Sequence, residues 1–295
     1  FTTATEFAIL DSSLLMMIED VTGDPNFPVR IYGGLFVTMP GLEEVARQIG
    51  NYENDLFKVP FIKTWTDGSI QGGTGYLKEG YHKLDSDSSK GATGTQDDIN
   101  AWVLTMYELG FRPGIHANGD AAMDLALNAL EYARKKTGRT DIRPHRIHAQ
   151  VIRPEQFPRI KALGAGITMF TPHVYFWGDM HRDLLLGPER AARINPMRTA
   201  IEHGIPTAMH NDPPVSPPDA LHSMWVAVNR RTSSGEILGP EERISAGQAL
   251  AAYTREAAVV LGIEDVVGTL EEGKKADFVV LAEDPLAVDP ENIKD

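Results

Sequence analysis

The amino-acid sequence predicts an α/β protein built on a parallel β-sheet. From residue 29 onward, short apolar runs alternate with amphipathic stretches, and the connections between them are short. This alternation is typical of a parallel sheet with crossover helices. Two architectures agree with it, an open doubly wound sheet and part of a (β/α)8 barrel. The alternation alone does not choose between them.

Six apolar runs are the expected strands. In chain order they cover residues 29–36, 59–65, 112–116, 145–150, 165–170 and 205–210. Between the runs, apolar residues recur at i, i+3, i+4 and i+7, which predicts helices that bury one face. Those helices are expected at 41–50, 97–110, 121–136, 155–164 and 196–204, with a last one at 245–262.

The pattern changes after the last of these helices. Residues 268–270 and 276–282 are short β-type runs on either side of a Glu-Glu-Gly-Lys turn. We therefore expect two domains. Residues 1–266 would form the α/β domain, and residues 267–295 would add small antiparallel strands.

Polar residues end or follow most of the expected strands, and they favour the barrel. The residues are Lys63, His116, His148, His173 and Asp212. In a barrel, the carboxyl ends of all strands converge on one face, where catalytic groups lie. An open sheet would instead spread these five residues along an edge.

Composition and charge restrict the classes of partner. The chain has 28 Lys and Arg against 41 Asp and Glu, a net charge of −13, so we expect no nucleic acid and no anionic membrane among its partners. It has no cysteine, which excludes thiolate metal sites and cysteine nucleophiles.

The start of the chain gives little information on location. No window approaches the roughly 20 continuous apolar residues of a membrane span, and the first residues lack the basic region of a signal peptide. The sequence opens on Phe1 in the middle of a pattern, as a fragment would. We expect a cytoplasmic location by default, and an upstream targeting segment is left open.

His116 and His148 are candidate metal ligands. They end successive strands 32 residues apart, about one strand–helix unit, so in a barrel their imidazoles would be neighbours. Neutral imidazole is a common ligand of Zn²⁺. The alternative is a pair of hydrogen-bonded histidines in the core or at the rim.

Asp212 and Lys63 are the other candidates. A carboxylate at a strand end can bind a metal or act as a general base, although Asp212 before Pro213-Pro214 also fits a turn or a helix cap. Lys63 lies within an apolar run, and burial of an ammonium group is costly unless the group is paired or neutralised. Its amine would extend to the solvent at the strand end, pair with Asp67, or carry a carboxylate formed with CO₂, which can bridge two metals.

His173 and Trp177 suggest a substrate pocket, because an aromatic cluster follows a polar strand end there. Packing of an ordinary loop explains the cluster almost equally well. The remaining histidines are expected to be structural or solvated: His82, His145, His181, His203 and His222.

Taken in order, several motifs resemble the amidohydrolase superfamily, in particular the amidohydrolase 3 group that includes N-substituted formamide deformylases. They are "FIKTWTDGSIQGGTGYL", "GIHANGDAAMDLALNALE", "RIHAQ", "LGPERAARINPMRTAIEHGIP", "NDPPVSPPDALHSMWVAV", "SAGQALAAYTREAA" and "GTLEEGKKADFVVLAEDPL". The likeness runs from about residue 29 to the end, and the ordered set is more specific than any single motif.

The resemblance implies a metal-dependent hydrolase on a (β/α)8 barrel with a small β-sandwich beside it. One or two divalent ions, usually zinc, would lie at the carboxyl mouth of the barrel. The implied metal residues are Lys63 of strand 4, often carboxylated, His116 of strand 5, His148 of strand 6 and Asp212 of strand 8. His173 matches a strand-7 histidine near the substrate, and Arg198 matches an arginine assigned here to substrate binding.

Two departures from the family pattern stand out. The His-x-His pair that ends the family's first strand is absent, so the chain is expected to contain only strands 3–8 and the C-terminal part of the sandwich. Exposed strand edges would then favour homo-oligomers. Where relatives commonly have Gly-Ser-Asp, this chain has His210-Asn211-Asp212, and the larger side chains of His210 and Asn211 are expected to narrow the substrate pocket or to add a ligand.

The leading hypothesis is a metal-dependent hydrolase of amide or other non-peptide C–N bonds in small molecules. Hydroxide formed on the metal would attack the carbonyl, with Asp212 as general base and then general acid. The alternative is a catalytically degenerate relative that acts as a regulatory or binding protein. A third hypothesis, a metal-free enzyme on an open sheet, would hold Lys63, His116 and Asp212 too far apart to cooperate.

Overall fold

Seven strands form a single parallel sheet in which each strand pairs with its neighbours in the sequence. The computed structural model describes residues 1–295. The sheet order is β1 to β7 without a reversal, and every pairing is parallel. The strands are β1 (Thr3–Ile9), β2 (Arg30–Phe36), β3 (Phe57–Trp65), β4 (Arg112–Ala117), β5 (His145–His148), β6 (Gly166–Met169) and β7 (Thr207–Met209).

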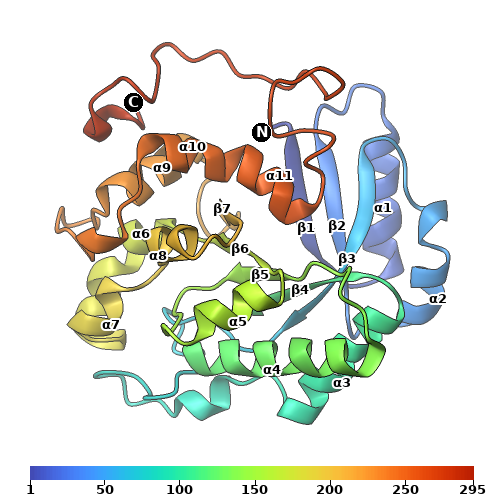
Figure 1. The fold of residues 1–295 in the computed structure, drawn as a ribbon, viewed down its shortest axis with the longest axis horizontal. Helices are drawn as coiled ribbons and strands as arrows, with labels where there is room; N and C mark the ends of the chain where they lie inside the picture. The colour runs from blue at the N-terminus through green and yellow to red at the C-terminus, as the bar shows by residue number, and fades with distance from the viewer.

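The strand order decides between the two predicted architectures. A doubly wound sheet starts in the middle and reverses direction, whereas a (β/α)8 barrel adds each new strand to the same edge. The observed order matches the barrel, and the expected incomplete barrel is confirmed (Figure 1). The carboxyl ends of the strands therefore lie at one end of the sheet.

The structure contains one strand more than the sequence pattern indicated. β1 pairs with β2 along the edge of the sheet, and most of its residues are at least partly exposed. β1 contains Thr3, Thr5 and Glu6 and lacks the continuous apolar run that is typical of a parallel strand buried on both faces. For this reason the apolar pattern predicted no strand before residue 29.

Helices follow nearly every strand, as expected. They are α1 (Ser12–Gly23), α2 (Leu42–Arg47), α3 (Gln96–Glu108), α4 (Asp120–Thr137), α5 (Gln156–Ala162), α6 (Pro172–Met180), α7 (Pro188–Ala192), α8 (Met197–Glu202), α9 (Ala220–Asn229), α10 (Ala246–Tyr253) and α11 (Arg255–Leu261). α6 continues into one π-helical turn, His181–Leu185. The helix predicted for 245–262 is divided into α10 and α11 at Thr254, whose backbone is not helical.

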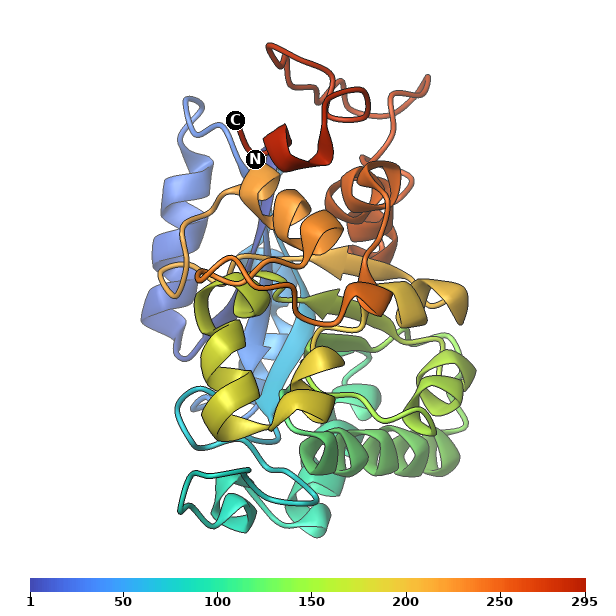
Figure 2. The same cartoon turned by 90° about the vertical axis from the view of Figure 1, so that its left-hand side faces the viewer.

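Two clusters of buried apolar side chains hold the layers together. The larger cluster packs α3, α4, α9 and α10 against β4 to β7, and the smaller one packs α1 and α2 against β1 to β3. Figures 1 and 2 show α1 and α2 beside the first strands, while α6 and α7 lie at the far side of the molecule. None of the helices has the length and hydrophobicity that crossing a membrane requires.

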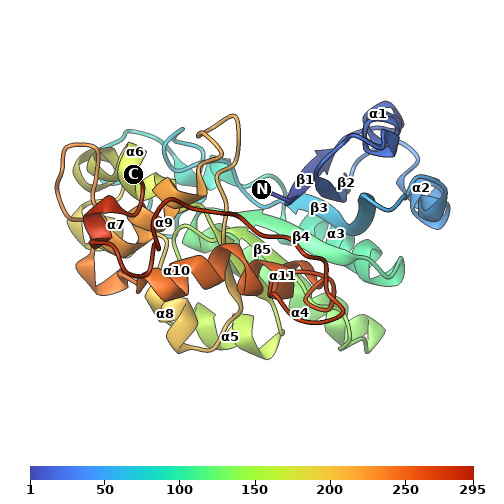
Figure 3. The same cartoon turned by 90° about the horizontal axis from the view of Figure 1, so that it is seen from above.

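The C-terminal segment differs from the prediction. After α11 the chain forms no further strand and only a short 3-10 turn at Pro290–Asn292, and it runs as a long coil over the outside of the molecule (Figures 1 and 3). Phe278, Val279 and Val280 are 71%, 75% and 85% exposed. A strand needs a neighbour for its backbone hydrogen bonds, and none of the seven strands pairs with the segment, although Asp277 forms an ion pair with Arg30 at the start of β2. The division into domains 1–266 and 267–295 stays a prediction.

Candidate active site

Four of the predicted site residues lie at or just beyond the carboxyl ends of their strands. Lys63 and His116 are near the ends of β3 and β4, His148 is the last residue of β5, and Asp212 follows β7. The ring centroids of His116 and His148 are 4.4 Å apart, and those of His148 and His210 are 4.9 Å apart. The imidazoles predicted to be neighbours are therefore in contact.

His116 is oriented by the chain that follows β3. Its Nε2 lies 2.9 Å from the carbonyl oxygen of Gly68, and because a carbonyl only accepts, Nε2 donates this bond, which leaves Nδ1 as the ring nitrogen available to a metal. Asn118 Nδ2 donates to the same carbonyl (2.8 Å). The buried Asp67 carboxylate lies 3.4 Å from Nε2 and accepts three backbone N–H groups. Bonds of this kind to the second ring nitrogen commonly orient histidines that bind metals.

His148 has a strained backbone and an unsatisfied side chain. Its φ angle is 68°, in the left-handed region, and its buried Nδ1 has no hydrogen-bond partner. Burial, reinforced by repulsion from His116, His210 and Lys63, lowers the pKa of His148 well below its usual value. A neutral imidazole with a free nitrogen results, and backbone strain of this kind is concentrated at functional sites.

Lys63 is almost fully buried, with 4% of its surface exposed. Burial lowers the pKa of its amine to about 7, and the negative charge of Asp212 partly opposes this shift. The Phe7 ring lies 5.4 Å from Nζ. Near neutral pH a large fraction of the amine is therefore uncharged, which is the form that reacts with CO₂. The structure does not pair Lys63 with Asp67, whose carboxylate is bound to the backbone beside His116.

The segment after β7 is built around Asn211. Its amide group bonds to Ser223, to two backbone carbonyls and to the hydroxyl of Tyr253, so this residue fixes the loop and does not line the pocket. The next residue, Asp212, has a φ angle of 53°. Its charge acts on Lys63 and His210, and burial lowers the pKa of His210 to about 4. The His210 ring thus lies beside that of His148, and its part in narrowing the pocket or adding a ligand stays a prediction.

These residues match a divalent cation in their chemistry, but they do not form a complete ligand set. Neutral imidazole nitrogens, a carboxylate and a largely uncharged lysine are suitable donors. His148 Nδ1 and His210 Nε2 are buried and have no hydrogen-bond partner, as is expected of nitrogens that bind a metal ion. No three His, Asp or Glu side chains are arranged to hold a metal ion.

His173 and Trp177 lie on α6 rather than at the end of a strand. His173 is in the first turn of the helix, fully buried, 6.5 Å from His148 and 5.8 Å from Trp177 between ring centroids. Burial lowers the pKa of His173 well below its usual value. His173 therefore neighbours His148, and Trp177 contacts His173. The substrate pocket that these two residues would line stays a prediction.

Two further residues of this region, His181 and Gln150, were not predicted from the sequence. His181, expected to be structural or solvated, is fully buried, its ring centroid is 6.0 Å from that of His173, and its Nε2 lies 3.1 Å from the side-chain nitrogen of Gln150. Gln150 is also fully buried. The only available signal was the position of Gln150, two residues after His148 in "RIHAQ".

Arg198 does not join these residues. It is exposed on α8 and forms an ion pair with Glu202, one helical turn away (2.8 Å). Such i, i+4 pairs on a helix surface have a small effect on stability. Its expected part in substrate binding has no contact in the structure that supports it.

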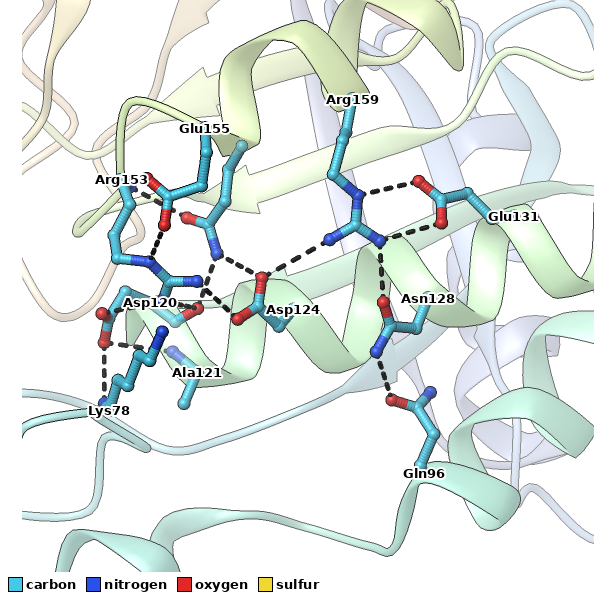
Figure 4. A network of polar contacts seen from close by, with 11 residues as sticks. Lys78, Gln96, Asp120, Ala121, Asp124, Asn128, Glu131, Arg153, Glu155 and Arg159 are labelled. Carbon is cyan, nitrogen blue, oxygen red and sulfur yellow. Dashed lines mark hydrogen bonds and ion pairs between the residues drawn. The ribbon is translucent and has the colours of Figure 1, made fainter.

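A network of ion pairs outside the sheet fixes the loops that carry the site (Figure 4). Arg153, in the loop after β5, binds the carboxylates of Asp120, Asp124 and Glu155. Asp120 also accepts the backbone N–H of Lys78, in the loop after β3. The loops that follow β3 and β5 are thus both tied to the start of α4, directly after His116 and its strand.

A model described as "Amidohydrolase family" matches residues 11–295. The chain belongs to the amidohydrolase family. The resemblance noted in the sequence is confirmed.

Two named relatives and one solved structure are also similar to this chain. The chain is 28% identical to the Bacillus subtilis protein YtcJ, named as an amidohydrolase, over 95% of this chain and 58% of YtcJ. It is 27% identical to an N-substituted formamide deformylase of Arthrobacter pascens, over 65% of this chain and 35% of the deformylase. Among solved structures, a metal-dependent hydrolase from Pyrococcus furiosus matches with a TM-score of 0.78 and 25% identity, over 96% of this chain and 56% of that one. The chain thus spans only part of the length of these relatives.

Proposed function

We propose that the protein hydrolyses amide or other non-peptide C–N bonds of small molecules with the help of one or two divalent metal ions, zinc in the first place. The observation that carries the proposal is the contact between His116 and His148 at adjoining strand ends, with the free Nδ1 of His148 and the buried amine of Lys63 beside them. The similarity to a formamide deformylase and to a metal-dependent hydrolase supports the reaction type.

The residues would divide the work as follows. Lys63, His116, His148 and Asp212 would hold the ion. Zinc, when bound, would supply the Lewis acidity that polarises a carbonyl and lowers the pKa of water to about 7. Asp212 takes a proton from the attacking water and returns it to the leaving nitrogen. His173 and Trp177 would form the wall of the pocket on which the substrate lies.

Release of amine tests this function. We expect the protein to liberate butylamine from N-butylformamide or N-butylacetamide, to lose this activity with a chelator and to regain it with Zn²⁺. A dipeptide such as Ala-Ala serves as the peptide control and is expected to remain intact. Absence of amine release from zinc-loaded protein, with a wider set of N-acyl amines also inert, would favour the regulatory alternative. Faster cleavage of the dipeptide would contradict the preference for non-peptide bonds.

A further inference from the structure

Two glutamine–histidine pairs lie next to the candidate metal residues, and apart from His173 in the pocket wall their side chains have no part in the proposed function. Gln71 Nε2 lies 3.4 Å from His173 Nε2, and Gln150 Nε2 lies 3.1 Å from His181 Nε2. The two imidazoles are close to each other, with ring centroids 6.0 Å apart. One of them, His173, is 6.5 Å from His148. The pairs therefore continue the row of histidines that begins at His116.

Each pair uses only half of its hydrogen-bonding capacity. The remaining atoms, Oε1 of both glutamines and Nδ1 of both histidines, are buried and have no partner. His173, His181 and Gln150 are at most 1% exposed, whereas Gln71 is partly exposed and forms the side nearest to solvent. Buried polar atoms without partners are rare and costly in folded proteins. These four atoms, in two adjacent pairs, are hydrogen-bonding groups that a bound ligand would satisfy.

The pairs are neutral and offer both donors and acceptors. An amide nitrogen only donates, so each histidine accepts through Nε2, and a neutral ring then presents Nδ1–H as a free donor beside the free Oε1 of glutamine. If both amide groups are turned by 180°, Oε1 accepts from Nε2–H, and the free groups become an amide donor and an Nδ1 acceptor. In either arrangement each pair has one donor and one acceptor left.

We propose that Gln71, His173, Gln150 and His181 form a recognition site for a neutral carboxamide-type group of the substrate, one that carries both a carbonyl oxygen and an N–H, and that this site rejects carboxylates. A carboxylate has only acceptors and would leave the free acceptors of the site unsatisfied while losing its own hydration. This inference rests on the proposed hydrolysis of C–N bonds and names the chemical class that the site selects. The π-helical turn that begins at His181 agrees with it, since such turns are frequent at functional sites.

Binding of benzamide and benzoate to the chelator-treated full chain tests this site without any turnover. The two compounds have nearly the same shape but differ in charge and in donors. By calorimetry, we expect benzamide to bind at least about tenfold more tightly than benzoate. Replacing one partner of a buried hydrogen bond is typically felt as about a tenfold change, so Gln150→Leu and Gln71→Leu are each expected to weaken benzamide by about that factor. Neither variant is expected to strengthen benzoate.

Gln156→Leu is the matched control. Gln156 is equally buried but bonds to Asp120 and Asp124 between α4 and α5, so its replacement is expected to leave the benzamide affinity within twofold. Gln71 is partly exposed, so Gln71→Leu decides the question if Gln150→Leu does not fold. The inference is overturned if wild-type protein does not bind benzamide, if benzoate binds as tightly, or if benzamide affinity is unchanged in the folded variants. Amine release without this preference would overturn the recognition site alone, and the preference without amine release would overturn the proposed function alone.

Discussion

Asp212→Asn is expected to lower kcat for amide hydrolysis by about 10²–10⁴-fold while the protein stays folded. A positioned general base contributes a factor of this size, and asparagine keeps the shape of the side chain but cannot take up a proton. The backbone at this position has a φ angle of 53°, which asparagine tolerates as well as aspartate does. The loss should therefore appear in kcat, with the circular dichroism spectrum unchanged.

The control for this variant lies in the same loop. Asp219 caps α9 by accepting the backbone N–H of His222, and it is exposed. Asparagine is an equally good cap, so Asp219→Asn is expected to keep kcat within twofold. If folded Asp212→Asn also turns over at the wild-type rate, Asp212 has no part in the proton transfer.

Lys63→Met is expected to abolish activity and to stabilise the metal-free protein by about 1–4 kcal/mol at pH 6. Replacing a buried charge by an apolar side chain of similar volume commonly has an effect of this size. Lys63 is 4% exposed, and burial lowers the pKa of its amine from 10.5 to about 7. A lysine that destabilises the fold is expected where its amine is needed for function.

The stability gained from Lys63→Met is expected to depend on pH. Below pH 7 the lysine is charged in both states and burial has its full cost. Between pH 7 and 10.5 the unfolded chain binds the proton and the folded protein does not, so wild-type stability rises with pH. Urea denaturation of chelator-treated protein should thus show a larger gain from Lys63→Met at pH 6 than at pH 9. Lys58→Met, at a half-exposed position of the same strand, should change stability by less than about 0.5 kcal/mol. Loss of stability in Lys63→Met at pH 6 would contradict the account of Lys63.

The sequence predicted the parts of the molecule in which local pattern and tertiary structure agree. Buried strands such as β3 and β4 are short runs rich in apolar residues, and the spacing between His116 and His148 placed them on adjacent strand ends, where their rings are in contact. The edge strand β1 was missed because its half-exposed residues lack such a run. The strands expected after residue 267 depended on a neighbouring strand, which a local pattern does not reveal.

The candidate site was predictable only where a residue type has few ordinary uses. A lysine within an apolar run is unusual, so Lys63 could be selected from the sequence, and the structure shows that it is buried. Glutamines and histidines on helices often have structural roles, so Gln150 and His181 could not be selected from the sequence. Only the structure shows that the two side chains are in contact and that each has a buried atom without a hydrogen-bond partner. In contrast, Asn211 looked like a pocket residue from its motif but serves to hold the loop.

The central claim is that the strand ends carrying Lys63, His116, His148 and Asp212 bind a metal ion. Elemental analysis of full-length protein purified without chelator tests it most directly, with the His148→Ala variant prepared in parallel. The account predicts about one to two equivalents of zinc or a similar divalent ion in the wild-type protein and a clear loss in the variant. Folded wild-type protein that contains no metal and takes none up from added Zn²⁺ would contradict it.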